Sequence, residues 1–181
     1  IVARDGRVLA TPREHAYREA SLTSVHLPRE FKSEDFSISV EKNLSHVKVR
    51  IIDQITDLVT KELHLDMPVS DGEIKADVSR DVIKIAAIDR THSPGRFFVG
   101  LLKGYHMKKG AFATSAPWDT SDIIVVGANE NDMVLAVNRI RDLQGGTLVC
   151  ADGRILAELP MPIYGLISNA PMEFLATRME R

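Results

Sequence analysis

A buried strand leads directly into a capped helix in DIIVVGANENDM, residues 122–133. The continuous apolar run after Asp122 predicts a buried strand over 122–127. Asn129 is a favourable N-cap, and Asp132 three residues later gives the spacing of a capping box with negative charge in the first turn. The apolar helix positions share one face: Met133, Val137 and Ile140, with Val134 beside them. Gly145-Gly146 is expected to end the helix with a left-handed cap.

Strand patterns dominate the rest of the chain. Alternation over 47–51 and apolar runs elsewhere predict strands at 47–51, 58–65, 82–88, 97–102 and 111–114. Asp152-Gly153 predicts a hairpin of 147–150 with 155–159. A last helix is expected from 168–171 to about Met179, with Pro171 in its tolerated first turn. The predicted class is α+β (mixed α/β), a strand-rich mixed sheet with at least two helices.

Three segments are expected along the chain. Residues 1–10, with Asp5-Gly6 between apolar runs, predict the terminal hairpin of a sheet belonging to what precedes them, so we interpret the sequence as a piece of a longer protein. Residues 11–38 are polar and aperiodic, which indicates an extended connector lying over a surface or against a neighbour. Residues 39–181 are expected to form the main domain.

Composition excludes several classes of protein. The chain has 181 residues, with 23 Lys+Arg against 25 Asp+Glu, which suits one domain or a domain with an appendage. A net charge of −2 favours neither nucleic acid nor an anionic membrane as partner. No apolar run is long enough to span a bilayer. The single cysteine, Cys150, excludes an intrachain disulfide and a multi-thiolate zinc site, and a cytoplasmic protein is the simplest interpretation.

Local catalytic motifs are absent from the sequence. The six histidines are all more than four residues apart, so they form no metal-binding pair, and no metal ligands are expected. No Gly-x-Ser-x-Gly elbow occurs, and Cys150 lies in an apolar strand where an inert buried thiol is usual. Gly127-Ala128-Asn129 precedes a helix, but a plain capped turn is favoured over an anion site. Lys108-Lys109 is most simply a solvated turn.

Two loops at predicted strand ends carry functional groups. Arg90 and His92 follow the strand at 82–88, while Trp118 and Asp119 precede the strand at 122–127. Loops held at strand ends are common places for binding sites. The alternatives are a surface Arg–Asp pair and a tryptophan that covers a sheet edge.

Several runs together resemble the C-terminal domain of bacterial adenine deaminases. They include GAFATS at 110–115, DIIVVGANENDM at 122–133, LAVNR at 135–139, and LAELP at 156–160. Asp81-Val82-Ile83-Lys84-Ile85-Ala86 and Asp89-Arg90 agree as well, and the resemblance covers essentially the whole chain.

The resemblance implies a part of a metal-dependent amidohydrolase that converts adenine to hypoxanthine and ammonia, with a metal-activated hydroxide attacking purine C6. A divalent transition metal (Mn, Fe or Zn) would lie in a TIM barrel that precedes this region. Residues 1–10 would then complete a small composite β domain, and the chain would pack on its own N-terminal barrel, most simply in a homo-oligomer. The isolated chain is expected to be inactive, with Arg90, His92 and Asp119 as candidate substrate-loop residues.

One loop departs from the family pattern. Where the family usually has Ala-His-Asp-Ser-His-Asn, this chain has PWDTSD at 117–122, so Trp118 and Ser121 replace two histidines and Asp119 remains. Tryptophan offers one donor and serine a short hydroxyl, whereas imidazole can donate, accept and titrate. A hydrolase with a different purine or related substrate, and a non-catalytic binding or scaffolding module, are therefore alternatives.

Overall fold

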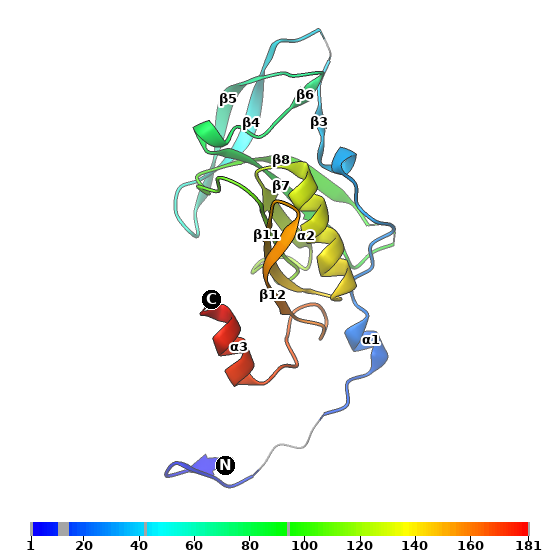
Figure 1. The fold of residues 1–181 in the computed structure, drawn as a ribbon, viewed down its shortest axis with the longest axis vertical. Coiled ribbons are helices and arrows are strands. Elements are labelled where there is room, and N and C mark those ends of the chain that lie inside the picture. The colour runs from blue at the N-terminus through cyan, green and yellow to red at the C-terminus, as the bar shows by residue number, and fades with distance from the viewer. Residues whose placement is uncertain (1, 11–14, 42, 94, 181) are drawn as a thin grey trace.

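An eight-stranded mixed sheet forms the centre of the computed structural model, which describes residues 2–10, 15–41, 43–93 and 95–180 (Figure 1). Ile1 and residues 11–14 of the expected connector lie outside the described residues. The strand order is β12-β11-β9-β10-β7-β8-β4-β5. The strands are β4 (His46–Gln54), β5 (Thr60–Pro68), β7 (Val82–Ile88), β8 (Phe97–Lys103), β9 (Ala111–Thr114), β10 (Ile123–Gly127), β11 (Gly146–Ala151) and β12 (Arg154–Pro160).

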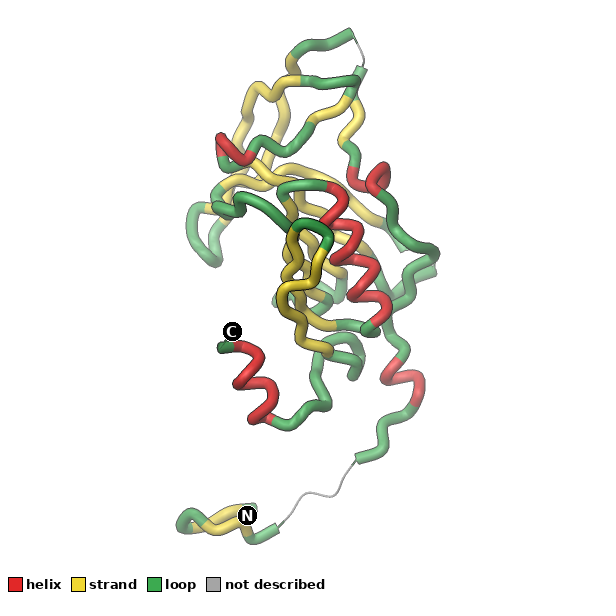
Figure 2. The backbone as a smooth tube through the Cα atoms, viewed as in Figure 1, coloured by secondary structure: helices red, strands yellow, loops and turns green. Residues whose placement is uncertain are grey.

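Several smaller elements complete the described structure (Figure 2). They are the hairpin β1 (Ala3–Arg4) with β2 (Arg7–Val8), the pair β3 (Ile38–Ser39) with β6 (Glu73–Ile74), the helices α1 (Glu19–Leu22), α2 (Glu130–Asp142) and α3 (Met172–Met179), and the 3-10 turns η1 (Ser33–Phe36) and η2 (Val78–Arg80). The expected α+β class is confirmed. None of the described helices is both long and apolar enough to cross a membrane.

Pairing in the large sheet is antiparallel except between β4 and β8. That parallel contact joins only Ile52 to Leu102 and Asp53 to Lys103. The β4–β5 hairpin therefore extends from the sheet, and a separate apolar cluster around Ile51, Met67 and Leu101 packs it against β3 and β6. The strand expected at 58–65 begins later because Thr56 Oγ1 accepts from the backbone of Leu58 and Val59 and closes the hairpin turn there.

One face of the sheet is covered by α2, as the sequence pattern predicts. Met133, Val137 and Ile140 are fully buried against small and branched residues of β9, β10 and β11, while Val134 packs beside the core. Segment 25–36 of the expected connector joins the same core through Val25, Phe31 and Phe36. The second half of the expected connector is therefore part of the hydrophobic core and does more than link two parts of the chain.

The two ends of α2 are capped differently from each other. At the start, Asn129 Oδ1 accepts from the Asp132 backbone at 2.9 Å, but the Asp132 carboxylate accepts from the Asn129 side chain, so the expected capping box forms only in part. At the end, the left-handed residue is Gln144 (φ 57°), which corrects the expectation for Gly145. Gly145 N–H donates to Ile140 O and Gln144 N–H to Arg141 O, the pattern of a Schellman motif.

Gly145 is required for a different reason. A Cβ at this position would lie 2.3 Å from Gly165 Cα and 2.8 Å from Met161 O. The glycine therefore permits the close approach of two backbones rather than supplying the helix cap alone.

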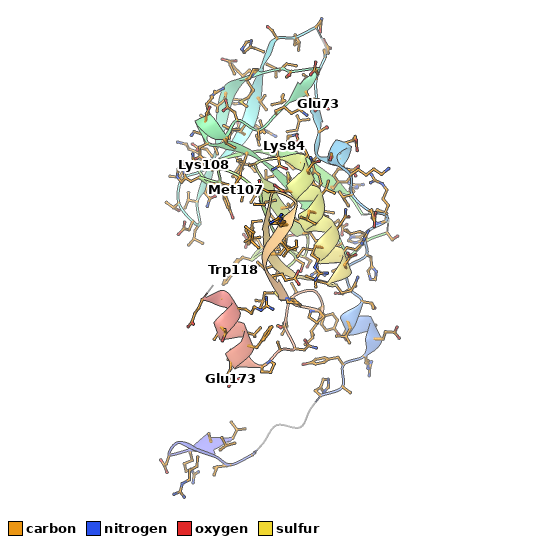
Figure 3. All side chains as sticks on the ribbon, in the orientation of Figure 1. Glu73, Lys84, Met107, Lys108, Trp118 and Glu173 are labelled. Carbon is orange, nitrogen blue, oxygen red and sulfur yellow. The ribbon has the colours of Figure 1, made fainter. Side chains whose placement is uncertain are left out.

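Two buried charges fix the start of α2. The Asp132 carboxylate accepts from Gly153 N at 2.9 Å and from Asp152 N at 3.3 Å, which ties the helix to the β11–β12 turn. Lys84 is fully buried, and its Nζ donates to Glu130 Oε1 at 2.6 Å and to Phe36 O at 2.7 Å. Figure 3 shows Lys84 at the helix start. The charge of Lys84 is thus compensated by an anion and a carbonyl.

Replacing Asp132 with alanine is expected to lower the free energy of unfolding by about 2–3 kcal/mol, because buried donors lose a charged acceptor. Urea denaturation of the Asp132→Ala variant measures this loss. Asp142→Ala, at a half-exposed position on the same helix, is the control and should change stability by no more than about 0.5 kcal/mol. Equal losses in both variants would contradict the tether.

The Asp132 contribution is also expected to depend on pH. Burial alone would raise the pKa of Asp132, but hydrogen bonds from Asn129 and the Gly153 and Asp152 backbones leave it below its usual range. The stabilisation is therefore present above the unfolded-state pKa of about 3.9 and is lost as the pH falls through the lower folded-state value. The difference between wild type and Asp132→Ala should stay constant from neutral pH to about pH 5 and shrink below about pH 4. A difference that grows on acidification would contradict this assignment.

Candidate functional site

The two loops singled out in the sequence leave the same end of the sheet. Ile88, the last residue of β7, pairs with Ile123, the first residue of β10. The loop 89–96 and the loop 115–122 therefore start from neighbouring strand ends. A third segment joins them, because Ser115 Oγ donates to Gly165 O at 2.6 Å. This end of the sheet is the candidate site.

Arg90 is buried at this end, with only 2% of the residue exposed. Its Nη1 donates to Ser24 O at 3.2 Å, and its backbone carbonyl accepts from His26 N at 2.9 Å. Its Nε has no hydrogen-bond partner among the described residues, and neither has the buried Ser24 Oγ. The interpretation as a surface Arg–Asp pair is therefore wrong.

The Arg90 charge is only weakly compensated. Burial lowers the pKa of Arg90 from its ordinary value, and the negative charge of Asp122 acts in the opposite direction. No hydrogen bond between Arg90 and a carboxylate occurs among the described residues. Because a buried charge without a close partner is costly, the packing around Arg90 must hold it in place.

That packing comes from a tight turn at residues 163–166. Tyr164 (φ 54°) and Gly165 (φ 67°) are both left-handed, and Leu166 N–H donates to Ile163 O, as in a type I′ turn. Asp-Gly occupies the same two conformations at 5–6, 71–72 and 152–153. A tyrosine at the first position is less suited to positive φ than aspartate. The Tyr164-Gly165 pair is the signal that sequence reasoning missed.

His92 lies on the surface, paired with its own loop. Asp89 accepts from Thr91 N at 2.8 Å, from His92 N at 3.2 Å, and from His92 Nδ1 at 2.7 Å. The backbone hydrogen bond from Thr91 is the largest influence that holds the pKa of Asp89 well below its usual range. Asp89 therefore stays ionised and orients the His92 ring through its Nδ1.

Trp118 and Asp119 project from the neighbouring loop. Trp118 is 99% exposed, so the interpretation as a cover for a sheet edge is wrong. Asp119 is exposed as well. The loop is held behind them, because Thr120 Oγ1 donates to Asp122 Oδ2 at 2.6 Å. The structure therefore brings the two candidate loops to one sheet end, with His92 and Asp119 at the surface and Arg90 beneath it.

Cys150 and Lys109, which the sequence analysis also discussed, lie away from this end of the sheet. Cys150 is buried, and burial raises the pKa of its thiol to about 11, which agrees with an inert residue. Lys109 pairs with Asp152 at 3.0 Å on the surface. No group of three or more His, Cys, Asp or Glu side chains that could hold a metal occurs in the part of the chain that the structure describes.

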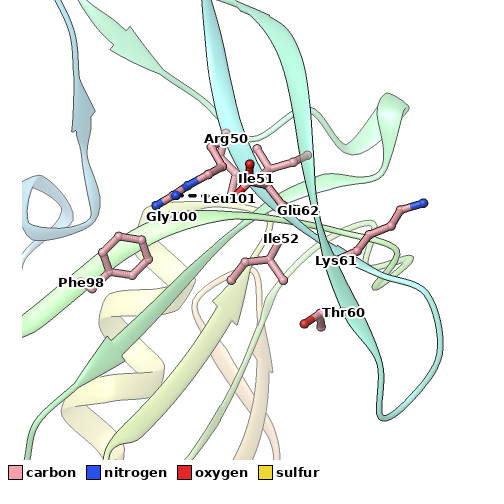
Figure 4. A pocket seen from close by; sticks show the side chains of 9 residues that line it. All are labelled: Arg50, Ile51, Ile52, Thr60, Lys61, Glu62, Phe98, Gly100 and Leu101. Atoms are coloured by element: carbon pink, nitrogen blue, oxygen red, sulfur yellow. Dashed lines mark ion pairs between the residues drawn. The ribbon is translucent and has the colours of Figure 1, made fainter.

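A groove lies apart from the candidate loops, between β4–β5 and β8 (Figure 4). It has a volume of about 410 Å³. Its lining combines apolar residues with Thr60, Lys61 and the pair Arg50–Glu62, whose charged atoms are 3.5 Å apart. The Phe98 ring lies against Gly100, where a Cβ would be 2.8 Å from the ring. Neither Arg90, His92 nor Asp119 lines this groove.

Gly165→Ala and Gly153→Ala together test the packing on Arg90. Gly165 has a φ of 67° and Gly153 a φ of 72°, and each follows a residue that is itself left-handed. A Cβ at Gly153 meets no atom within 4 Å, whereas one at Gly165 would be 2.7 Å from Arg90 Nη1. Gly153→Ala should therefore cost about 1 kcal/mol for its backbone conformation, and Gly165→Ala at least about 2 kcal/mol. Thermal unfolding measures both.

An Arg90→Ala background supplies the control for this comparison. Removing the guanidinium should bring the Gly165→Ala loss down towards the Gly153→Ala loss, since the two residues are in contact and their effects couple. Equal losses in the two glycine variants of the otherwise unchanged chain would contradict the contact.

Comparison with known proteins shows the family to which the chain belongs. Residues 57–181 match the family model described as the adenine deaminase C-terminal domain. A protein named adenine deaminase from Clostridium botulinum (strain 657 / Type Ba4) is 34% identical over 100% of this chain and 30% of its own length. Another from Lysinibacillus sphaericus is 36% identical over 95% of this chain and 29% of its own length. One from Kosmotoga olearia is 42% identical over 68% of this chain and 21% of its own length.

The chain thus spans about 30% of the length of the first of these curated relatives. The family match extends from the β4–β5 turn through the whole remaining sheet, α2 and α3. The chain belongs to the family of adenine deaminase C-terminal domains.

Proposed function

We propose that this chain is the C-terminal domain of an enzyme that hydrolyses adenine to hypoxanthine and ammonia. The observation that carries the proposal is the match of residues 57–181 to that domain, together with relatives named adenine deaminase that align over 95–100% of the chain. In this reaction the oxygen of water replaces the exocyclic amine on C6 of the purine, and the amine leaves as ammonia.

The reacting centre is proposed to lie in an N-terminal amidohydrolase barrel. A divalent transition metal, Mn, Fe or Zn, would be bound there, as in the amidohydrolases that the chain resembles. Residues 2–10, 15–41, 43–93 and 95–180 bring together no group of three or more His, Cys, Asp or Glu side chains. The described residues therefore do not fit that metal, and the role of this chain is to shape and cover the site. A cytoplasmic homo-oligomer is part of the same proposal.

Arg90, His92 and Asp119 are proposed to act from the sheet end described above. His92 and Asp119 lie at the surface, where they can accept or donate a hydrogen bond to a purine. Only 2% of Arg90 is exposed to solvent. We therefore assign it a positioning role, in which it holds the loops and does not touch the substrate.

The proposed domain division follows the same reasoning. Residues 1–10 would complete a small composite β domain, 11–38 would connect it, and 39–181 would form the C-terminal domain. The β1–β2 hairpin has no buried residue, which supports its assignment to another body. Phe31 and Phe36 are buried in the main core, so in this division the last part of the connector packs against the C-terminal domain.

A second candidate function rests on one loop. Trp118 and Ser121 stand where the family pattern has histidines, and the Trp118 side chain is almost fully exposed. These replacements favour either a related purine as substrate or a binding and scaffolding module without turnover. A purine panel separates the two, because only the first alternative releases ammonia from any member of the panel.

The 181-residue chain alone is expected to release no ammonia from adenine, whereas a longer polypeptide that includes the proposed barrel should release one ammonia per hypoxanthine formed. A coupled ammonia assay with hypoxanthine quantified by chromatography measures both. Turnover by the isolated chain would overturn the placement of the chemistry. Absence of turnover in the metal-loaded longer polypeptide would favour the second candidate function.

Asp119→Asn and His92→Gln in the longer polypeptide are each expected to lower kcat/KM for adenine about 10-fold, the effect of losing one polar substrate contact. Asp57→Asn, an exposed aspartate in the β4–β5 turn, is the matched control and should leave kcat/KM unchanged. If all three variants behave alike, the two loop residues do not face the substrate.

A further inference from the structure

The backbone of β8 directs hydrogen-bonding groups to two opposite edges. Asp89 N–H donates to Arg96 O at 2.8 Å, and this pair continues the antiparallel register of β7 with β8. In such a pair, residues whose backbone groups face the partner strand alternate with residues whose groups face away from it. The β8 residues whose groups face β7 are Phe98, Gly100 and Leu102. The β8 residues whose groups face the other edge are Phe97, Val99 and Leu101.

The strand on that other side, β4, pairs with β8 only through Ile52 and Asp53. Figure 1 shows the β4–β5 hairpin rising away from β8 beyond this contact. Because Leu101 borders the contact, the groups left over are the N–H and C=O of Phe97 and Val99. No described strand pairs with them on this side. We call the backbone of residues 97–100 on this side the open β8 edge.

The facing edge of β4 is open in the same way. Val69 N–H donates to Ser45 O, and this pair continues the antiparallel register of β4 with β5. The alternation then directs the backbone groups of Lys48 and Arg50 away from β5 and towards β8. Among the residues that the structure describes, no strand pairs with either of them on that side. Two edges with unused backbone groups therefore face each other.

The groove described above lies between these two edges. Gly100 has no side chain to fill it, and Phe98 beside it is 61% exposed. Figure 4 shows Phe98 at one end of the groove, with Thr60 and Lys61 at the other. The volume of about 410 Å³ is therefore space that the side chains of the described residues leave free next to the open β8 edge.

The outer edges of the large sheet are protected against strand addition, whereas the open β8 edge is not. Natural sheets protect their edges with charges, proline and bulges. The outer strand β5 carries Lys61, Glu62 and Asp66 and ends at Pro68. The opposite outer strand, β12, ends at Pro160, and a bulge interrupts its pairing. The β8 run FFVGLL at 97–102 has no charge, no proline and no shift of register with β7.

An extended polypeptide backbone is the chemistry that matches this edge. Along one side it offers N–H and C=O groups at every second residue, which is the repeat at which Phe97 and Val99 present theirs. A small molecule can pair with one of these residues but does not follow the edge. Peptides that add a strand to a sheet gain affinity from backbone hydrogen bonds and specificity from alternate side chains.

We propose that the open β8 edge binds an extended segment of another polypeptide as an added strand. Gly100 leaves room for a β-branched side chain of that segment beside Phe98. Arg50 lines the groove with a side chain that is 74% exposed, so it suits an acidic residue of the segment. The partner is therefore an extended, β-branched and acidic segment. This binding does not depend on adenine hydrolysis by the longer polypeptide.

Residue-resolved amide hydrogen exchange of the 181-residue chain tests whether the edge is open. The amides of Phe98, Gly100 and Leu102 face β7 and should be protected. The amides of Phe97 and Val99 should exchange at least about 100-fold faster than those three. Equal protection along β8 would overturn the proposal, because the edge would then already be paired.

A synthetic peptide then supplies the strand. The probe is the acetylated and amidated heptapeptide Glu-Val-Thr-Val-Thr-Val-Glu, and its control has proline in place of the central valine. At about 1 mM, the probe should slow exchange of the Phe97 and Val99 amides at least about 10-fold and leave Gly100 unchanged. The proline control should protect neither amide. Absence of protection by the probe at this concentration would overturn the proposal.

Two substitutions at one residue locate the added strand. Val99→Pro removes an N–H that β7 does not use, and proline is tolerated on a strand edge. Val99→Ala loses the same packing on the core but keeps the N–H. The probe should no longer protect the Phe97 amide in Val99→Pro and should still protect it in Val99→Ala. Protection that survives Val99→Pro would contradict strand addition here.

A surface variant keeps this test decisive even where Val99→Pro does not fold. Arg50→Glu reverses a charge at an exposed position and should weaken the Kd of the probe at least about 5-fold. Arg154→Glu makes the same change at an exposed position of β12 and should leave the Kd unchanged. Equal Kd values in both variants would contradict binding beside Arg50.

Other occupants of the edge give different results. Protection of the Phe97 and Val99 amides that rises with protein concentration and without the probe, with a dimer seen by light scattering, would overturn the proposal in favour of a second copy. In the longer polypeptide the two amides should also exchange fast until the probe is added. Protection there beforehand would place the edge in an internal interface and would overturn the proposal, whether or not adenine is hydrolysed.

Discussion

Close approach of α2 to the sheet at Gly127 determines how the rest of the molecule is arranged. A Cβ at Gly127 would lie 2.4 Å from Met133 Cγ, so only glycine lets the methionine pack onto the strand. The small side chains of Ala111 and Ala113 also allow the helix to lie close to the sheet. Val137 and Ile140 of the helix are fully buried. Each such side chain contributes about 1.5–3 kcal/mol when it is removed from water. The helix in turn sets the position of the β11–β12 hairpin.

A division between the two ends of the molecule follows from this packing. The face beneath α2 is closed by the helix and by segment 25–36, and its polar groups are paired, as Lys84 with Glu130 illustrates. The sheet end that carries the candidate loops is built differently: the buried Arg90 makes no hydrogen bond to a carboxylate of the described residues, and Tyr164 adopts a left-handed conformation. These costs lie at the sheet end from which the loops with His92, Trp118 and Asp119 leave.

Local patterns predicted the elements well, and long-range packing accounts for the differences. The strand at 82–88 and the helix after Asn129 follow directly from apolar runs and a cap, because each depends on residues adjacent in sequence. Arg90 could not be predicted as buried, since its burial depends on a turn about 75 residues further along the chain. The sequence pointed to Gly145-Gly146 as the left-handed cap, whereas the cap residue is Gln144. The two glycines instead permit close contacts with the backbone of neighbouring segments. The candidate residues Arg90, His92 and Asp119 lie in loops at strand ends, as the sequence predicts, but their depth depends on the tertiary structure.

The buried pair of Lys84 and Glu130 restricts how this domain can change over generations. Loss of Glu130 leaves the fully buried Lys84 ammonium with the Phe36 carbonyl, whereas loss of Lys84 leaves Glu130 partly exposed and 3.7 Å from Lys75 Nζ. Substitutions at the two positions are therefore coupled unequally, and a lineage that loses the lysine first meets a smaller cost than one that loses the glutamate first. Within the family, a sequence without the glutamate is expected to lack the lysine as well.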